Sequence, residues 1–305
     1  MTTAKTRKDL INIIINPVKK ESTPDSSAYT NTYKFSRNNK SIMLPSLSIF
    51  LLAYNEEKNI EQSVRDAFAV AKKVARRYEV LIVYYEGSSD GTLAILRKLQ
   101  KRKEYRSLRI VTQKREQKGY GTALRLGIDA AKHEYVFYTD GDRQFDLNDL
   151  TLLARHAPRY DIVSGYRKKR SDLIMRRVAA AVYNIILQIV FDTGVRDVDS
   201  ALKIYRRAIF ERIRVRCTSG MADAEILIKA RRAGFRIREV GVPHYHREYG
   251  DGQFSNKLGL IKPAVVLGLL RDMHRVWQDV NAPRARSRSD RRTQGIKRKG
   301  RGKRL

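Results

Sequence analysis

The chain has 305 residues, of which 42% are hydrophobic, so it can bury one large core and still carry extensions. Its single cysteine, Cys217, excludes an internal disulfide framework and fits a reducing compartment. No run approaches the roughly 18 apolar residues of a spanning helix, and Leu10–Ile15 is too short for a signal peptide, so we expect neither. The 63 Lys and Arg exceed the 32 Asp and Glu and give a net charge of +31, which predicts a polyanionic partner.

The positive charge is concentrated at both ends of the chain. Residues 284–305 contain eleven Lys or Arg and one acid, and residues 1–45 contain eight basic and three acidic residues. Both segments are polar, so we predict a mostly disordered N-terminal extension over 1–45 and a disordered basic tail over 284–305. Between them we expect one folded domain over residues 46–256 and an amphipathic helix over residues 257–283.

In the first half of this domain, predicted strands and helices alternate. Short apolar runs predict strands over Leu47–Ala53, Val80–Tyr84, Leu108–Thr112 and Tyr135–Thr139. Helical spacing of apolar residues predicts helices over Ile60–Tyr78, Thr92–Lys101 and Thr122–Ala131. The connections between strands are too long for hairpins, so we predict an α/β domain with a mainly parallel central sheet flanked by helices.

The second half of the chain is less regular. We predict further strands over Ile162–Tyr166, Val198–Tyr205 and Phe235–Val242. We predict helices over Leu173–Phe191, Ala222–Ala233 and Leu258–Val280. The first and last of these helices have the length and pattern either of core packing or of contact with a membrane interface, and both interpretations stay open.

Polar residues follow the predicted parallel strands, at the edge of the sheet where ligands collect. Tyr54, Asn55 and Glu56 follow the first strand, Glu86 follows the second, and Asp140-Gly141-Asp142 follows a later one. Two carboxylates separated by one glycine can turn toward the same hard cation, and oxygen ligands of this kind suit Mg²⁺ or Mn²⁺ bound with a diphosphate. Alone, the motif is more often a surface turn than a metal site.

The surrounding motifs supply the missing context. They occur in order at the spacing of one α/β domain: Leu52–Glu57, Glu86–Thr92, Gly119–Arg125, Asp140–Gln144, Gly165–Arg167, Val195–Ser200 with Lys203, and Glu239–Val240 with His244–Tyr245. In these motifs the chain resembles the family 2 inverting glycosyltransferases, which include polyprenyl- and dolichyl-phosphate mannose and glucose synthases. The resemblance runs from about Leu47 to Arg247 and implies a single catalytic domain of GT-A fold.

The resemblance implies a donor site for a nucleotide-diphosphate sugar. Residues implied in nucleotide-sugar binding are Ala53, Tyr54, Glu56, Glu86, Ser88, Gly119, Asp140 and Gly141. Residues implied near Mg²⁺ or Mn²⁺ are Asp140, Asp142, Gln144 and His244. Glu86 and Tyr85 stand where relatives usually have two Asp, which leaves the base unassigned between UDP- and GDP-linked donors. A structural loop is an equally good interpretation of Gly119-Tyr120-Gly121.

The resemblance also implies an acceptor side. Asp142, Asp197 and Asp199 are the expected catalytic residues, and Arg167, Arg176 and Lys203 match positions that hold a lipid phosphate. An alcohol acceptor needs a general base, for which Asp197, Asp199, Asp223 or Glu225 could serve. A phosphate acceptor does not strictly need one, because its second pKa of about 6 leaves it largely ionised at neutral pH.

We therefore expect metal-assisted, inverting transfer of a sugar to a polyprenyl phosphate, with a glycan or protein hydroxyl as the alternative acceptor. Relatives often carry spanning helices after the catalytic domain and have Gly and Pro where this chain has Ala201 and Gly241. We expect a cytoplasmic enzyme in peripheral contact with the membrane. Two alternatives of another class are an inactive GT-A scaffold and a nucleic-acid-binding protein that uses its basic tail.

Overall fold

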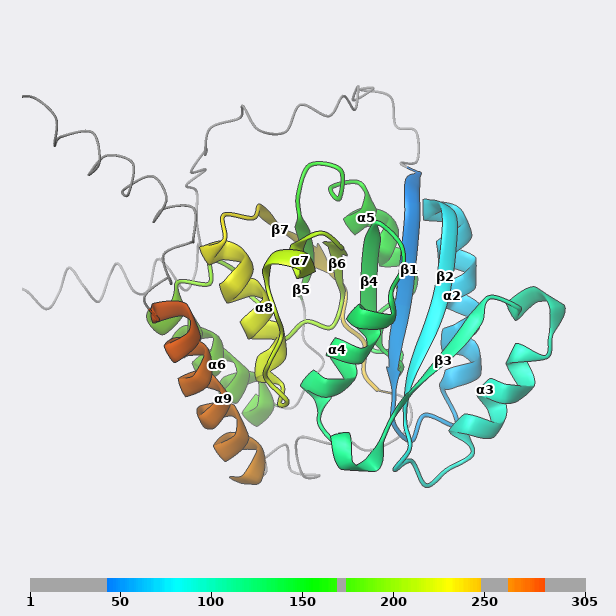
Figure 1. The fold of residues 1–305 in the computed structure, drawn as a ribbon, viewed down its shortest axis with the longest axis horizontal. Coiled ribbons are helices and arrows are strands. Elements are labelled where there is room, and N and C mark those ends of the chain that lie inside the picture. Colours follow the sequence, from blue (N-terminus) through cyan, green and yellow to red (C-terminus); the bar gives the residue numbers. More distant parts are fainter. Residues whose placement is uncertain (1–42, 169–173, 248–262, 283–305) are drawn as a thin grey trace, which may run out of the picture.

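The computed structural model describes residues 43–168, 174–247 and 263–282, which form a central sheet flanked by helices (Figure 1). The seven strands lie in the order β3-β2-β1-β4-β6-β5-β7. Their bounds are β1 Leu44–Ala53, β2 Ala75–Tyr85, β3 Leu108–Gln113, β4 Tyr135–Asp140, β5 Ile162–Arg167, β6 Lys203–Arg206 and β7 Ile237–Val242. The predicted extensions over 1–45 and 284–305 fall almost entirely outside the described residues, although β1 begins two residues before the predicted start of the domain.

The sheet is mainly parallel, as predicted. Strand β1 pairs in parallel with β2 and β4, β2 with β3, and β5 with β7, whereas β6 is antiparallel to both β4 and β5. Eight of the ten residues of β1 are buried, because helices cover both faces of the sheet and leave no solvated side. The apolar run from Leu47 to Ala53 is therefore the sequence of a central strand.

Helices pack on both faces. The α-helices are α2 Ile60–Val74, α3 Thr92–Gln100, α4 Tyr120–Ala130, α5 Leu150–Ala154, α6 Ile174–Phe191, α7 Ile209–Arg212, α8 Met221–Arg232 and α9 Pro263–Asn281, with short 3₁₀ helices η2 Lys103–Tyr105, η3 Arg115–Gln117 and η4 Leu147–Asp149. Helix α2 contacts α3 and α5 on one face, and α4 contacts α8 on the other. Helix α9 packs on the outside of α8 (Figure 1). Among the described helices, none combines the length and apolar character needed to cross a bilayer.

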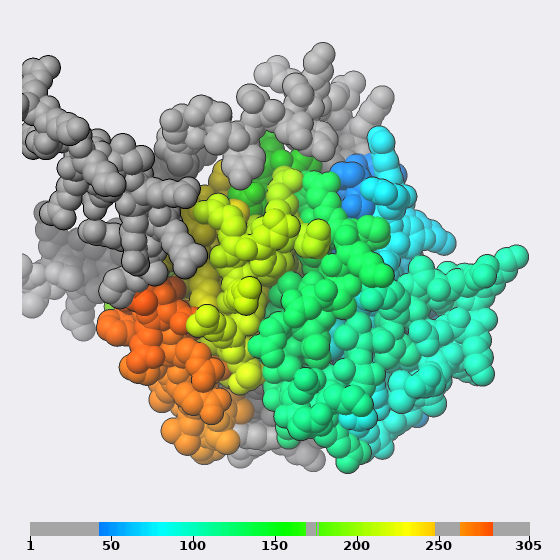
Figure 2. Space-filling view, in the orientation of Figure 1, coloured from blue at the N-terminus to red at the C-terminus, as the bar shows by residue number. Residues whose placement is uncertain are grey.

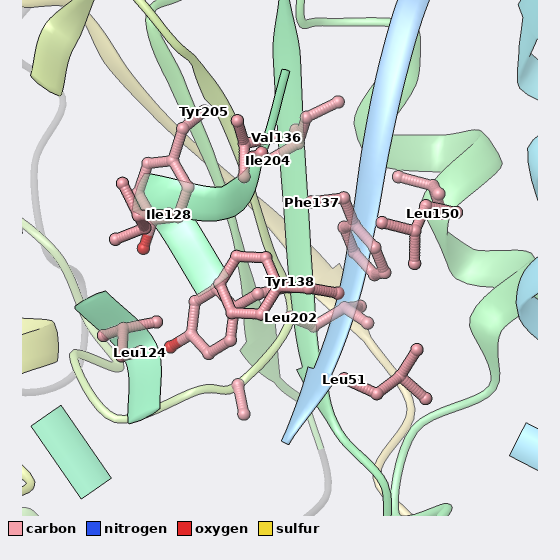
Figure 3. Close-up of a cluster of buried hydrophobic side chains, with 14 of the residues drawn as sticks. Leu51, Leu124, Ile128, Val136, Phe137, Tyr138, Leu150, Leu202, Ile204 and Tyr205 are labelled. Carbon is pink, nitrogen blue, oxygen red and sulfur yellow. The ribbon is translucent and has the colours of Figure 1, made fainter. Parts of the chain in front are cut away.

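Aromatic side chains fill the core between the sheet and these helices. The rings of Phe50 and Tyr138 stack at 5.5 Å, and those of Tyr138 and Tyr205 at 6.1 Å. Figure 3 shows that Phe137 points toward Leu150 of α5, whereas its neighbour Tyr138 points to the opposite face of the sheet. Successive side chains of a strand point to opposite faces of the sheet, so β4 contributes an aromatic ring to the core on each face.

Two predicted elements were wrong in part. The helix predicted over Ile60–Tyr78 ends at Val74, and β2 begins at Ala75 because Leu44 and Ala75 pair in register. The apolar spacing continues past the helix end because the Tyr78 ring packs edge-on against Phe68, with 6.1 Å between ring centroids. The strand predicted over Val198–Tyr205 begins only at Lys203. The Val198 N–H instead donates to the side chain of Asn184.

Candidate active site

The predicted donor residues converge at the carboxyl ends of β1, β2 and β4. Strand β1 lies between the other two, and its register places Ala53 beside Tyr84 and Leu52 beside Asp140. The loops that leave these three parallel strands therefore emerge at one edge of the sheet. This is where an open α/β sheet binds its ligands, as the sequence predicted.

The loop after β1 is held against the loop after β2. Asn55 adopts a left-handed conformation with φ of 54°. Its N–H donates to the Ser88 hydroxyl at 3.3 Å, and its side-chain oxygen accepts from the Ser89 N–H at 2.8 Å. The Glu56 N–H donates to the Thr92 hydroxyl at 2.9 Å. These bonds order the edge of the predicted nucleotide pocket before any ligand binds.

Two aromatic side chains lie at this edge. The rings of Tyr54 and Tyr85 are tilted against each other with 5.6 Å between centroids. Glu86 accepts a 3.4 Å hydrogen bond from the Arg115 N–H and lies 3.5 Å from Lys114. Glu86 thus joins the loops after β2 and β3 and remains 42% exposed. Its predicted contact with the nucleotide stays a prediction.

The Asp140-Gly141-Asp142 turn is fixed to the end of β1. The Gly141 N–H donates to the Leu52 carbonyl at 3.0 Å, and the Gly141 carbonyl accepts from the Ser63 hydroxyl at 3.0 Å. A Cβ atom at position 141 would lie only 3.0 Å from the Leu52 carbonyl oxygen. Glycine is therefore the residue that lets the turn approach β1 this closely.

Acidic groups outnumber cations around this turn. Burial, followed by the charges of Asp142, Asp223 and Glu56, raises the pKa of Asp140 well above its usual range. Burial also raises the pKa of Glu56 to about 7, against the opposing effect of Arg247. Such a cluster is stabilised by an added positive charge, so the residues fit a divalent cation held by Asp140 and Asp142.

The other two predicted metal residues lie beside the turn. The Gln144 N–H donates to Asp142 at 3.2 Å, and Gln144 and Tyr245 are joined by a 2.9 Å backbone hydrogen bond. His244 is buried, with its ring edge-on to Phe145 at 5.1 Å. Among the described residues, no three His, Cys, Asp or Glu side chains form a ready metal cage. A cation held by Asp140 and Asp142 would complete its shell with phosphate oxygens and water.

Arg247 is a site residue that the sequence analysis did not single out. Its guanidinium lies 2.5 Å from a carboxylate oxygen of Glu56 and 3.5 Å from one of Asp142. Arg247 lies three residues after His244, in the segment that follows the end of β7. The other candidate site residues likewise follow the ends of strands. Its position after a predicted strand was the only feature of the sequence that could have pointed to Arg247, because its residue type does not distinguish it among 63 Lys and Arg.

The glycine turn that opens α4 has a structural role. Gly119 has a φ of +142°, and a Cβ there would lie 2.4 Å from the Thr218 carbonyl oxygen. A Cβ at Gly121 would lie 2.3 Å from the Cys217 carbonyl oxygen. Both glycines are needed for close packing against the segment before α8. Binding of a donor phosphate at Gly119 remains a prediction.

On the acceptor side, Arg167 and Asp197 are paired with each other. The guanidinium donates to both carboxylate oxygens, from Nε at 2.7 Å and from Nη2 at 2.6 Å, and the Arg167 N–H adds a third bond at 3.1 Å. Both side chains are 10% exposed. The sequence analysis gave these residues separate roles, whereas the structure makes them one bidentate ion pair.

Lys203, which was predicted to hold an acceptor phosphate, lies enclosed in the core. The side chain is completely buried and pairs with Asp223 at 2.8 Å. It also donates to the Ser200 carbonyl, and the Tyr138 hydroxyl donates to the same Asp223 carboxylate. These contacts give the Lys203 ammonium group a structural role, and its contact with a phosphate stays a prediction. Arg176 lies within α6, and its contact with a phosphate stays a prediction.

The candidate bases differ in their surroundings. Asp223 accepts from Lys203, Tyr138 and Tyr120, and Glu225 accepts from two backbone N–H groups and Lys229. Asp199 keeps part of its surface exposed. Burial and the charges of Asp223 and Asp197 raise the pKa of Asp199 to about 7. A carboxyl with that pKa is suited to take up a proton near neutral pH, which favours Asp199.

Solved structures share the fold. Glucosyl-3-phosphoglycerate synthase from Mycobacterium tuberculosis, in complex with Mn²⁺, UDP and glucosyl-3-phosphoglycerate, aligns with a TM-score of 0.58 and 19% identity over 79% of this chain and 82% of that chain. The same enzyme with Mg²⁺ and UDP aligns with a TM-score of 0.56 and 19% identity over 79% and 81%. The predicted GT-A fold is thereby confirmed.

Curated relatives are similar to about two thirds of the chain. Dodecaprenyl-phosphate galacturonate synthase from Rhizobium johnstonii is 31% identical over 216 residues, 68% of this chain and 62% of that protein. Undecaprenyl-phosphate 4-deoxy-4-formamido-L-arabinose transferase from Salmonella paratyphi A is 26% identical over 212 residues, with the same two coverages. The matched region thus spans 62% of the length of these relatives. The family described as "Glycosyl transferase family 2" matches residues 48–214, so the chain belongs to glycosyl transferase family 2.

Proposed function

We propose that this protein transfers a sugar from a UDP- or GDP-linked donor to a polyprenyl phosphate, with inversion at the anomeric carbon. The observation that carries the donor half is the cluster of Asp140, Asp142 and Glu56 around one guanidinium, at the carboxyl ends of β1 and β4. The names of two relatives support the acceptor half, because both contain a polyprenyl phosphate.

The donor would lie across the ordered edge of the sheet. Ala53, Tyr54, Glu56, Glu86 and Ser88 would contact the nucleotide. Asp140 and Asp142 would hold Mg²⁺ or Mn²⁺, with Gln144 and His244 beside them. When bound, the cation supplies the positive charge that stabilises a diphosphate leaving group. The buried, strand-anchored turn fixes both carboxylates before the donor arrives, so little rearrangement accompanies the reaction.

The acceptor would approach from the side of Asp197 and Asp199. One phosphate oxygen forms a bond to the anomeric carbon as the bond from that carbon to the diphosphate breaks, and the nucleoside diphosphate leaves. The Arg167–Asp197 pair would orient the phosphate through the guanidinium that the carboxylate holds in place. Asp199 would take the remaining proton of a phosphate monoanion.

The pH dependence of transfer tests the role of Asp199. The carboxyl has a pKa of about 7, so the wild-type rate should fall as the pH drops below 7, because a protonated Asp199 cannot accept a proton. In Asp199→Asn the limb near pH 7 should be lost and the rate should be lower than that of the wild type at pH 8, with the remaining fall near pH 6, the approximate second pKa of a phosphate monoester. Rates measured from pH 5 to pH 8 with saturating donor decide this. Coincident profiles for the two proteins would remove Asp199 from the mechanism.

A transfer assay on the full chain tests the proposed function as a whole. UDP- and GDP-linked sugars are each supplied with Mn²⁺, together with a polyprenyl phosphate or with the same polyprenol lacking phosphate. We expect product with the phosphate acceptor and one class of donor, and none with the polyprenol or in excess chelator. Transfer to a glycan or protein hydroxyl with none to the phosphate would refute the acceptor. If the chain bound no nucleotide sugar, the proposed glycosyltransferase activity would be refuted.

The proposed substrate also gives a proposed location. A polyprenyl chain resides in a bilayer, so the reaction would take place at a membrane surface, on the cytoplasmic side. The catalytic domain would comprise residues 46–256, and the basic tail over 284–305 would add attraction to anionic lipids of roughly 1 kcal/mol for each Lys or Arg near the surface.

A further inference from the structure

Helices α6 and α9 expose apolar side chains that no described element covers. On α6 these include Val178, Val182 and Ile189, and on α9 they include Leu267, Leu270 and Trp277. We call these six side chains the apolar helical surface. Their exposed fractions reach 72% at Ile189 and 68% at Leu267. Spacings of three, four and seven residues place each set on one side of its helix.

Both helices contact the segment that leads into α8. The Tyr183 hydroxyl of α6 lies 3.2 Å from the sulfur of Met221. On α9, the Asp272 carboxylate accepts from the N–H groups of Thr218 and Ser219 at 3.1 and 3.0 Å. Figure 1 shows the two helices together at one side of the molecule, and Figure 2 shows α9 on the surface there. The two apolar sets therefore lie on helices at the same side of the molecule.

Most charges that border this region are positive, and the exposed carboxylate of Asp192 at the end of α6 pairs with Arg231 at 3.0 Å. Helix α6 contains no acidic residue, and Arg177, Arg271 and Arg275 are exposed. The acids of α9 face inward, since Asp272 is buried and Asp279 pairs with Lys229 at 3.0 Å. The sequence that follows α9 carries eleven Lys or Arg and one acid. A surface that is apolar in the middle and cationic around it matches an anionic bilayer.

The inner side of α6 contacts the acceptor side of the candidate site. The Asn184 side chain accepts from the Val198 N–H at 3.0 Å, within the segment that carries Asp197 and Asp199. An α-helix with its side chains is only about 10–12 Å across. A bilayer in contact with the outer side of α6 would therefore lie one helix away from the acceptor carboxylates, where a phosphate at the lipid surface comes within reach.

We propose that the apolar helical surface of α6 and α9 docks on an anionic bilayer, with its side chains entering the interface. A second copy of the chain fits this surface less well, because pairing would bring together two cationic borders on chains of net charge +31. The inference deepens the proposed function, on which it rests for the lipid nature of the acceptor. The docking itself can be measured without any catalysis.

The chain contains its own probe for this docking. Trp277 is the only tryptophan in the sequence, and its side chain is 49% exposed within the apolar helical surface. When the full chain is mixed with phosphatidylcholine vesicles containing phosphatidylglycerol, the Trp277 emission should shift to the blue. Bromine-labelled lipid should quench it. Binding without either change would show that the basic tail alone holds the vesicle, which overturns the proposal.

Two variants separate the apolar surface from electrostatics. Ile189→Ser and Leu267→Ser should each weaken vesicle binding roughly tenfold at a salt concentration that screens the tail, because each removes one buried aliphatic side chain from the interface. Met43→Ser is the matched control, since Met43 is 43% exposed at the start of the described chain, outside this surface. Equal binding by all three variants, or a concentration-dependent dimer with the same blue shift in the absence of vesicles, would overturn the proposal.

Comparing two acceptors distinguishes failure of this inference from failure of the proposed function. Ile189→Ser and Leu267→Ser should keep wild-type transfer to a short, water-soluble prenyl phosphate and lose most transfer to a long-chain acceptor in vesicles. If no acceptor is used by the wild type, the proposed function fails, and the fluorescence result still decides the docking. If both variants use the vesicle acceptor at the wild-type rate, the docking proposal is refuted and the proposed transferase activity is supported.

Discussion

Asp142→Asn should lower sugar transfer by about two to three orders of magnitude, because a bound cation contributes several kcal/mol of stabilisation to the developing charge. The substitution keeps the size of the side chain and an oxygen that can accept from the Gln144 N–H, but it removes the charge. Mn²⁺ should no longer strengthen nucleotide-sugar binding, which a thermal-shift titration of the full chain with and without Mn²⁺ measures.

The stability of Asp142→Asn distinguishes a lost cation site from a lost fold. The charge of Asp142 raises the pKa of the partly buried Asp140, so removing it relieves a repulsion in the metal-free protein. We therefore expect a melting temperature at or above that of the wild type, together with the loss of activity. Asp129→Asn, which removes an exposed carboxylate on α4, is the matched control and should change neither. Full Mn²⁺ dependence in Asp142→Asn would exclude the proposed cation site.

Lys203→Met should destabilise the domain by about 3–5 kcal/mol, the usual cost of removing one partner of a buried ion pair. The loss follows because Asp223 would keep its burial and lose the ammonium group that neutralises it. For a domain of this size the melting temperature should fall by roughly 2–4 °C for each kcal/mol. Lys98→Met, on the exposed side of α3, should have little effect.

A second substitution tests whether the pair itself is responsible. Asp223→Asn introduced into Lys203→Met removes the unpaired charge, so the double variant should be more stable than Lys203→Met alone, as a double-mutant cycle would show. If Lys203 instead bound the acceptor phosphate, Lys203→Met would raise the KM for the acceptor and leave the melting temperature unchanged. That result would contradict the structural role.

The position of the donor side could be predicted from the sequence because each of its motifs directly follows a predicted strand. Leu52 and Asp140 end neighbouring parallel strands, so their loops meet wherever the strands pair. The apolar run of β1 and the glycine between the two Asp were visible without any partner. The helix predicted through Tyr78 was wrong at its end because Tyr78, near the start of β2, packs its ring against Phe68 of α2 and so continues the apolar spacing past Val74.

The acceptor side depends on pairs that are distant in the chain. Asp197 pairs with Arg167, 30 residues away. The donor side has one such pair as well, because Glu56 pairs with Arg247, 191 residues away. A basic residue that binds a phosphate and one that neutralises a buried carboxylate look alike in sequence, and only the fold separates them. The buried pairing of Lys203 could not be predicted because its partner, Asp223, lies on a different element.

The Asp272 contact has a consequence for how the protein is made. Asp272 lies on the last described helix and holds Thr218 and Ser219, and the Thr218 carbonyl in turn accepts from the Gly121 N–H at the opening of α4. Chains emerge from the ribosome N-terminus first, so the β1–β4 half is synthesised well before α9. The turn at Gly119–Gly121 thus receives its final support only when translation has passed residue 272. A nascent chain that has formed β1 to β4 would therefore lack the support of Asp272 until α9 docks.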